Sequence, residues 1–337
     1  MAITTNPWPL LGHDMAVERL ARAVQSDRVA HAYLFSGPDH IGKTTLARAF
    51  AQALLCLAGG ARPCGACRAC RLVQANRHPD MMTLDMAWQT MNLPTKGEAH
   101  SISVDAIRLM NNELSRRPHE GKWKVLLIPN VEEFTLSAAN AFLKTLEEPP
   151  AFVIILLTTR EVELVLPTIR SRCQPMPLFP LPSEQVEQGL QVRWGVEPER
   201  ARLLARLGGG RIGWAIQAAQ DSKVLEKRGA ALDNLQQALQ GNRAERLLLA
   251  ASLSKADDEE VLPLWASWWR DVLMVQQGAE NVIANIDQST ALEQAAQRYT
   301  PAQVQGFLRE LQRLLRLAQT TNLNRQLYWE VLLLKLP

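Results

Sequence analysis

The segment Gly37-Pro-Asp-His-Ile-Gly-Lys-Thr44 constrains the fold more than any other part of the chain. It matches the phosphate-binding loop G-x-x-x-x-G-K-[ST], in which backbone N–H groups wrap a phosphate where a helix begins. The apolar residues Tyr33–Phe35 precede the loop and a helical pattern follows it, which is the context that the motif requires. We therefore predict an α/β fold built around a phosphate site.

Each residue type in the loop has a physical task. Gly37 and Gly42 permit a tight backbone that a phosphate can approach closely. Lys43 reaches the β- and γ-phosphates, and Thr44 ligates Mg²⁺, with Thr45 beside it. We predict that these residues bind a nucleotide, with ATP and Mg²⁺ as the candidate ligands. The alternative is a glycine-containing turn that matches the motif by accident.

The strand that should supply acidic residues to this nucleotide lacks them. The apolar run Lys124–Ile128 ends on Pro129 and Asn130, where an ATPase would place an Asp and a Glu. Hydrolysis needs an acidic residue on Mg²⁺ and a polar group that orients the attacking water. Glu132 or Glu133 could substitute, but we favour the interpretation that both are a solvated helix start. The chain is then suited to hold a nucleotide and poorly suited to hydrolyse it.

Short apolar runs alternate with helical patterns through the first half of the chain, which predicts a parallel sheet with crossover helices. The predicted strands are Ala32–Ser36, Met81–Leu84, Lys124–Ile128, Phe152–Thr158 and Gln174–Phe179. Their near-continuous apolar character is typical of strands that are buried on both faces. Predicted helices cover residues 44–57, a segment capped by Ser103, and residues 137–148, before Pro149 and Pro150.

The pattern changes to helices alone after residue 179. A chain of 337 residues exceeds the size of one hydrophobic core, so two or three domains are expected. We predict an α/β domain over residues 1–179, a small helical domain over 180–222 and an all-helical domain over 223–337. Breaks between the helices are predicted near Gly241, Pro263, Gly278 and Pro301.

Charge and hydropathy exclude several classes of protein. The net charge of +3 is too small to argue for nucleic-acid binding by itself. The apolar run Phe152–Leu157 is too short to span a membrane. The first eight residues contain no charged segment followed by an apolar one, so no signal peptide is visible. We expect a cytoplasmic protein.

Four cysteines, Cys56, Cys64, Cys67 and Cys70, are crowded together, while Cys173 stands alone. In an intracellular protein, such clustering favours a metal over disulfides. Four thiolates can close a tetrahedral Zn²⁺ site with no open position, so we predict a structural zinc. The alternative is a set of unligated core cysteines, but residues that alternate with Gly and Arg make a poor core.

Arg172, in Ser-Arg-Cys at 171–173, stands just before the last predicted strand. A lone arginine there is commonly a surface residue or a helix cap. The other motifs of the chain change that interpretation. The phosphate loop, the cysteine insertion, His-Pro-Asp at 78–80, Leu-Lys-Thr-Leu-Glu-Glu-Pro-Pro at 143–150 and this motif together closely resemble the bacterial DNA polymerase III clamp-loader family. The resemblance covers residues 10–179 and continues more weakly to the end.

The resemblance implies an AAA+ module, a helical lid and a helical collar that joins five subunits in a ring. It implies that Arg172 is an arginine finger in the ATP site of a neighbouring motor subunit, and that Thr158 or Thr159 is the first sensor of the γ-phosphate. A guanidinium supplied in trans neutralises charge on the transferring phosphoryl group, so hydrolysis would require the assembled ring. The implied partners are gamma/tau-like motor subunits, a delta-like wrench subunit and, through the complex, the sliding clamp and primed DNA.

Departures from the family pattern indicate the type of subunit. Motor subunits carry an intact Asp-Glu pair where this chain has Pro129 and Asn130, and the delta-prime branch of the family tolerates that loss. The chain therefore resembles the delta-prime branch, although its phosphate loop is complete where some delta-prime chains have a degenerate one. Arg211 lies one residue early relative to the family's sensing arginine, and we assign it no nucleotide contact.

Three hypotheses follow. The first is a delta-prime-like stator that helps the ring load the clamp in DNA replication and is not an enzyme in its own right. The second is an ATP-hydrolysing motor subunit, gamma/tau-like, in which Glu132 or Glu133 replaces the lost acids. The third is a nucleic-acid-binding protein that uses the zinc module, against which the weak net charge argues. We expect the isolated chain to bind DNA poorly.

Trp265, Trp268 and Trp269 recur at the i, i+3, i+4 spacing of one helix face. The face either packs inside its own domain or meets a neighbouring subunit, since tryptophans are enriched at such contacts. The sequence leaves both interpretations open.

Overall fold

The computed structural model describes residues 8, 10–93, 101–255, 261–320 and 324–337. Residues 1–7, which make up most of the segment on which the prediction of no signal peptide depends, lie outside the described residues. The chain divides into two compact units. The first comprises the residues up to Leu181 together with Arg211–Gly213, and the second comprises Pro182–Gly210 and Trp214–Pro337.

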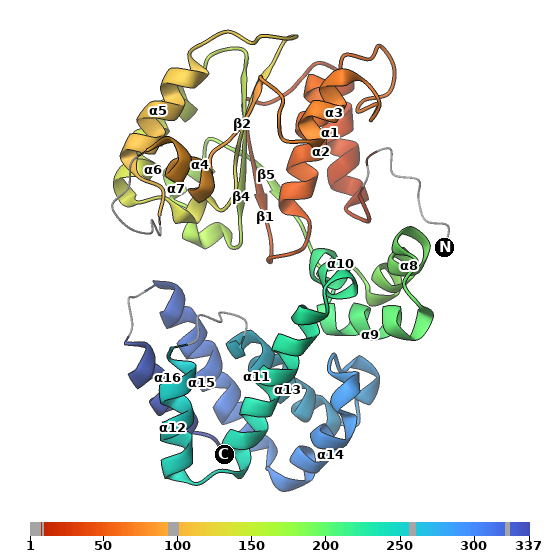
Figure 1. Cartoon of the computed structure of the whole chain (residues 1–337), viewed down its shortest axis with the longest axis vertical. Helices are drawn as coiled ribbons and strands as arrows, with labels where there is room; N and C mark the ends of the chain where they lie inside the picture. Colours follow the sequence, from red (N-terminus) through yellow and green to blue (C-terminus); the bar gives the residue numbers. More distant parts are fainter. Residues whose placement is uncertain (1–7, 9, 94–100, 256–260, 321–323) are drawn as a thin grey trace. The chain divides into compact units, whose positions relative to one another are not determined.

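Parallel strands form the sheet of the first unit (Figure 1). Their order in the sheet is β2-β3-β4-β1-β5. The strands are β1 (Ala32–Ser36), β2 (Met81–Thr83), β3 (Lys124–Ile128), β4 (Val153–Thr159) and β5 (Gln174–Pro177). The predicted bounds of β1 and β3 are confirmed, and those of the other strands differ only at their ends. β5 ends early because it is an edge strand that contains Pro175 and Pro177, and proline cannot donate to a ladder.

Side chains on successive strand positions alternate between two hydrophobic cores, one on each face of the sheet. Tyr33 and Phe35 join the core shared with α1, α2 and α3, whereas Leu34 joins the core shared with α4 to α7. Figure 1 shows these two groups of helices on opposite faces. The helices are α1 (Asp14–Gln25), α2 (Lys43–Leu55), α3 (Arg68–Gln74), α4 (Met86–Asn92), α5 (Val104–Leu114), α6 (Leu136–Glu147) and α7 (Pro167–Arg170), with 3-10 turns η1 (Val131–Glu133) and η2 (Val162–Leu164).

The predicted helix ends are confirmed to within two residues. The Ser103 hydroxyl caps α5 by accepting a hydrogen bond from the Ala106 amide at 3.3 Å. α6 ends at Glu147, before Pro149 and Pro150, and α2 begins at Lys43, directly after the loop.

Helices also make up the described part of the second unit. They are α8 (Ser183–Trp194), α9 (Pro198–Gly208), α10 (Ile212–Gln220, whose first two residues belong to the first unit), α11 (Ser222–Gln240), α12 (Arg243–Leu253), α13 (Val261–Gln276), α14 (Ser289–Arg298), α15 (Pro301–Thr320) and α16 (Arg325–Leu334), with 3-10 turns η3 (Glu280–Val282) and η4 (Ile286–Gln288). None of the described helices combines the length and the apolar character needed to cross a bilayer.

Three of the four predicted helix breaks are confirmed. Gly241 separates α11 from α12, Gly278 follows α13, and Pro301 opens α15. The break predicted near Pro263 comes earlier in the chain, between the end of α12 at Leu253 and the start of α13 at Val261, so Pro263 itself lies in the first turn of α13. Proline is tolerated there, since the first N–H groups of a helix have no intrahelical acceptor.

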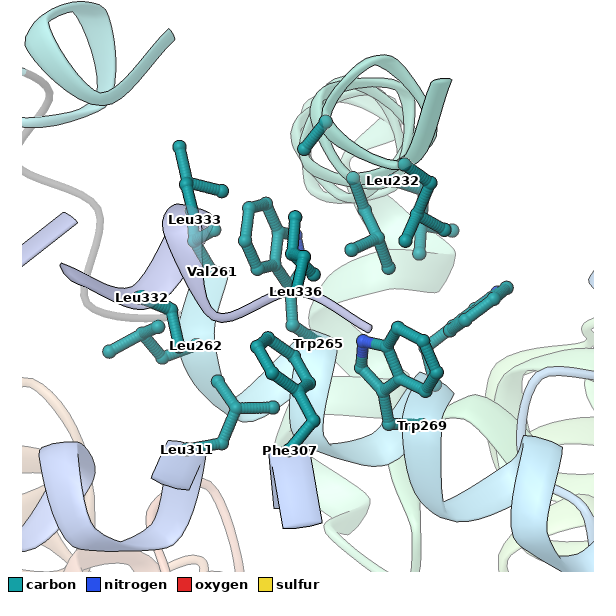
Figure 2. Close-up of a cluster of buried hydrophobic side chains, with 14 of the residues drawn as sticks. Leu232, Val261, Leu262, Trp265, Trp269, Phe307, Leu311, Leu332, Leu333 and Leu336 are labelled. Carbon is teal, nitrogen blue, oxygen red and sulfur yellow. The ribbon is translucent and has the colours of Figure 1, made fainter. Parts of the chain in front are cut away.

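The tryptophan face of α13 packs inside the second unit (Figure 2). Trp265, Trp268 and Trp269 are all 0% exposed, and Trp269 contacts Phe307 with the ring centroids 5.2 Å apart. The indole N–H of Trp265 donates to the Ala231 carbonyl at 2.9 Å. The interpretation as a packed helix face is confirmed, and the tryptophans are not available to a neighbouring subunit.

Candidate nucleotide site and metal centre

The carboxyl ends of β1, β4 and β3 bring the predicted nucleotide residues to one edge of the sheet. Phe35 pairs with Thr158 and Ser36 with Thr159, so the loop that follows β1 starts beside the end of β4. The Gly37 amide donates to the Thr159 carbonyl at 3.2 Å. β3 adjoins β4 on its other side and ends at Ile128, directly before Pro129 and Asn130. The arrangement is that of a phosphate-loop site at a topological switch of a parallel sheet.

The two glycines of the loop have backbone conformations that a side chain would not permit. Gly37 has φ of 144°, and a Cβ on it would lie 2.5 Å from the Leu178 carbonyl oxygen. Gly42 has φ of 106° and precedes the first turn of α2. The Gly213 amide donates to the His40 carbonyl at 2.7 Å, so the start of α10 contacts the loop.

Lys43 is buried, and its ammonium group is held by the loop itself. Its Nζ donates to the carbonyls of Gly37 at 2.7 Å and Pro38 at 2.9 Å, and to Asp39 Oδ1 at 3.3 Å. Burial lowers the pKa of Lys43, while the charges of Asp39 and Glu132 act in the opposite direction. Thr44 is half-buried and Thr45 is exposed on α2. Lys43 thus lies where it could bind a phosphate, and it already donates a hydrogen bond to the Asp39 carboxylate.

Asp39, Arg160 and Glu132 extend this contact into a chain of alternating charges. Asp39 Oδ2 lies 3.8 Å from Arg160 Nε, and Arg160 Nε donates to Glu132 Oε1 at 3.3 Å. The Arg160 amide donates to the same Glu132 oxygen at 3.0 Å. Two cations and two carboxylates therefore alternate in one network that starts at Lys43 in the loop and ends at Glu132.

The expectation that Glu132 and Glu133 form a solvated helix start is wrong. The Glu132 side chain is only 6% exposed, because Arg160 draws it against the end of β4. Glu133 accepts a hydrogen bond from the Asn130 side chain at 2.9 Å. Burial raises the pKa of Glu133, and this hydrogen bond acts against the shift. Neither carboxylate can be treated as a freely hydrated group.

Thr158, implied to sense the γ-phosphate, is fully buried. Its hydroxyl oxygen accepts a hydrogen bond from the Asn130 amide at 3.1 Å, which joins the ends of β3 and β4. The neighbouring Thr159 hydroxyl donates to the Glu161 carbonyl at 2.8 Å. Both threonines are at the predicted edge, with their hydroxyls engaged by the backbone of that edge.

The four clustered cysteines meet as predicted. All four sulfur atoms lie within 4.8 Å of one another, with Cys56–Cys67 at 4.0 Å and Cys64–Cys70 at 3.9 Å. A tetrahedral zinc with sulfur ligands at about 2.3 Å requires sulfur–sulfur distances of about 3.8 Å. All four are free thiols, and Cys64 is exposed, which does not fit a set of core cysteines. The cluster can hold a metal ion.

Backbone N–H groups point at the sulfur atoms of Cys64 and Cys67 and favour their thiolate forms by lowering the pKa of each thiol. Burial raises the pKa of Cys67, but hydrogen bonds from the Cys70 and Leu57 amides outweigh it and lower the pKa to about 6. Burial raises the pKa of Cys70, and the neighbouring Cys67 adds to that rise. A bound cation would stabilise the thiolate forms.

The His-Pro-Asp motif anchors the cysteine module to the sheet. Asp80 is fully buried and accepts hydrogen bonds from the amides of His119 at 2.6 Å and Glu120 at 2.7 Å. The Glu120 carboxylate in turn forms an ion pair with Arg68, at the start of α3. The motif therefore has a structural task in this chain.

Arg172 follows α7 and forms an ion pair with the last residue of α6. Its Nη2 lies 2.6 Å from Glu147 Oε1, and its Nη1 donates to the Thr168 carbonyl at 2.9 Å. The motifs at 143–150 and 171–173, far apart in sequence, thus meet. The guanidinium is partly exposed, and its proposed action on another subunit stays a prediction.

The sequence interpretation assigned no role to Asp39 or Arg160. Asp39 stands at a variable position of the loop motif, and nothing in the motif marks it. Arg160 carried a weak signal, since it directly follows a buried strand at the carboxyl edge of the sheet, where ligand-binding residues gather. Their pairing depends on the adjacency of β1 and β4 in the sheet, which the sequence does not specify.

Comparison with known proteins assigns the chain to a family. A family model described as DNA polymerase III, delta subunit, matches residues 12–182, and one described as its C-terminal part matches residues 222–337. DNA polymerase III subunit delta-prime of Escherichia coli is 32% identical over 323 residues, covering 95% of this chain and 92% of the relative. The Bacillus subtilis delta-prime subunit is 29% identical, covering 85% of this chain and 84% of the relative.

The similarity extends to a second kind of subunit. DNA polymerase III subunit tau of Escherichia coli is 31% identical over 288 residues, covering 84% of this chain but 40% of tau. The delta-prime sequences, in contrast, are matched over most of their own length. On the family models and on this near-complete match, the chain belongs to the family of DNA polymerase III delta-prime subunits, within the clamp-loader proteins.

Proposed function

We propose that this chain is a delta-prime-type stator of the DNA polymerase III clamp loader, which helps to load the sliding clamp onto primed DNA during replication. The observation that carries the proposal is the match to delta-prime subunits along 95% of the chain in one bacterium and 85% in another. A stator contributes fixed contacts to the complex and leaves ATP hydrolysis to its neighbours.

The nucleotide site supports a non-motor role. The loop keeps Gly37, Gly42 and Lys43 in a geometry that suits phosphate. Strand β3, which β4 separates from β1, is followed by Pro129 and Asn130. Lys43 would contact the phosphates of ATP and Thr44 its Mg²⁺. Neither Pro129 nor Asn130 supplies the acidic residue that hydrolysis needs on Mg²⁺.

The proposed division of labour follows the three predicted segments. Residues 1–179 form the AAA+ module, 180–222 the lid, and 223–337 the collar that joins five subunits in a ring. The partners are gamma/tau-like motor subunits and a delta-like subunit. Arg172 acts at the ATP site of a motor neighbour, as an arginine finger, once the ring has formed.

The proposed metal of the cysteine cluster is a structural Zn²⁺. Cys56 follows α2, Cys64 and Cys67 come from the next turns, and Cys70 lies in α3, so one ion would join segments that lack a large core of their own. Four thiolate ligands leave no open position for substrate or water. The role is stability of the module and not chemistry.

Assembly is the direct test of this function. Mixed with gamma/tau-like and delta-like subunits of the same organism, the chain is expected to enter one stable complex. Size-exclusion chromatography with mass measurement gives its stoichiometry. Clamp loading onto primed DNA should require the chain, and a complex prepared without it is the control. A chain that stays monomeric beside all of these partners would contradict the proposal.

One observation favours the rival motor function. In the part of the chain that the structure describes, Glu132 Oε2 is buried without a hydrogen-bond partner, and the Glu132 charge acts on Lys43. A buried carboxylate oxygen in that state is suited to a bound cation or a water molecule. Glu132 is therefore the candidate replacement for the lost acids.

Binding and turnover of ATP on one sample separate the two functions. The isolated chain is expected to bind ATP without measurable turnover, because the acid pair at the end of β3 is missing. Lys43→Ala should weaken binding about tenfold or more, since a charged hydrogen bond contributes about 1.5–3 kcal/mol. Titration calorimetry and phosphate release give the two quantities. Clear turnover that Glu132→Gln abolishes would make the chain a motor.

A further inference from the structure

The Lys43 ammonium group has three N–H donors, and all three have acceptors within the loop. Two are the carbonyls of Gly37 and Pro38, at 2.7 Å and 2.9 Å, which hold the lysine in place. The third is Asp39 Oδ1, at 3.3 Å. A phosphate oxygen that bound Lys43 would need this third donor, so Asp39 stands where the phosphate contact would form.

The second oxygen of Asp39 faces another cation. Asp39 Oδ2 lies 3.8 Å from Arg160 Nε, so the carboxylate bridges the lysine of the loop and the arginine that follows β4. Arg160 is itself held by Glu132 through its amide and its Nε. The two positive and two negative charges of this network of four side chains cancel. The loop is therefore not the uncompensated cationic site that an anionic ligand prefers.

The carboxylates of Asp39 and Glu132 differ in how easily they can move away from their cationic partners. Glu132 is 6% exposed and fixed by Arg160, whereas the Asp39 side chain is 46% exposed and can rotate into water. Asp39 is therefore the group that an incoming phosphate can displace. If it stayed, a second negative charge would lie within a few Å of the phosphate, which costs binding free energy.

We propose that Asp39 is an intramolecular competitor for the phosphates of a nucleoside di- or triphosphate, and that it sets the nucleotide affinity of this site. The proposal rests on the nucleotide binding proposed above and adds that the site carries its own displaceable anion. A stator whose nucleotide is only a weak ligand would follow from this contact, even though its phosphate loop is complete.

The test is Asp39→Asn in the full-length chain, titrated with ATP, ADP and AMP. Asparagine keeps the size of the side chain and removes the charge. The affinity for ATP and ADP should rise about fivefold, the equivalent of losing one partly exposed ion pair. The affinity for AMP should stay the same, because Lys43 contacts the β- and γ-phosphates.

Glu161→Gln is the matched control, since it removes one exposed carboxylate next to Arg160 that is not a partner of Lys43. It should leave all three affinities unchanged, and a urea titration shows that both variants remain folded. An equal rise in the affinity for ATP and ADP in both variants would show that the change in net charge alone causes the effect, and it would overturn the proposal. So would an unchanged affinity in Asp39→Asn, or no nucleotide binding in either form. The assembly test of the proposed stator function uses no added nucleotide. A failure of that function would therefore be distinguished from a failure of the Asp39 proposal.

Discussion

Replacing Arg172 by alanine is expected to abolish ATP hydrolysis at one motor site of the assembled clamp loader while leaving the complex intact. An arginine finger supplied in trans is worth about a thousandfold or more in rate at the site that it serves. Rapid-quench measurement of the first turnover should therefore show a fast phase smaller by the contribution of one site. Steady-state clamp loading should fall with it.

The fold should tolerate this substitution. The ion pair of Arg172 with Glu147 is partly exposed, and such pairs contribute about 1 kcal/mol or less. Arg170→Ala, two residues earlier, is the matched control, because its guanidinium donates to the Val162 carbonyl of the same subunit at 3.3 Å. Arg172→Lys should fail like alanine, since lysine lacks the planar fork that spans two phosphate oxygens. A full fast phase in an intact Arg172→Ala complex would reject the trans role.

Loss of the metal is expected to have the second large effect, on stability. The segment between α2 and α3, which carries three of the four cysteines, has few buried apolar residues, so the thiolate–metal bonds would hold it. Structural zinc contributes about 10–16 kcal/mol of apparent binding free energy in small domains. Cys70→Ser, or prolonged chelation, should therefore lower the free energy of unfolding of the first unit by about 3 kcal/mol or more. The unfolding midpoint would fall by about 6 to 12 °C.

Elemental analysis and thermal unfolding on the same samples check this result. Protein purified without chelator should contain one zinc per chain, and Cys70→Ser should contain none. Cys173→Ser is the control, because Cys173 is also buried but lies outside the cluster. Burial raises the pKa of Cys173 to about 12, so it is a neutral thiol at physiological pH. Zinc-free wild-type protein with an unchanged midpoint would show that the cluster has no metal.

Local patterns were sufficient to predict the framework of this protein. Apolar runs between helical patterns determined the parallel strands, with β1 and β3 confirmed at both ends. Ser103 was identified as a cap because its hydroxyl serves an amide only three residues ahead. The cysteine cluster was predicted because most of its members lie within two short turns. The cap and the cysteines involve groups that are close in sequence, so spacing alone constrains their geometry, and each strand was identified from its own apolar run without its pairing partner.

Tertiary structure decided what depends on groups distant in sequence. Glu132 was taken as solvated, but the adjacency of β3 and β4 places Arg160 against it and buries it. Pairing of β1 with β4 brings Asp39 to Arg160, and the docking of α6 against α7 brings Glu147 to Arg172.

The tryptophans of α13 show the same division. Helical periodicity was sufficient to place Trp265, Trp268 and Trp269 on one face. Whether that face is buried depends on α11, α15 and α16, which approach it from up to some sixty residues away in the sequence. The residue types and local spacing therefore determined the elements and the loop chemistry. Strand order and helix packing decided the partners of each charged and aromatic group, because those contacts form only when the chain folds.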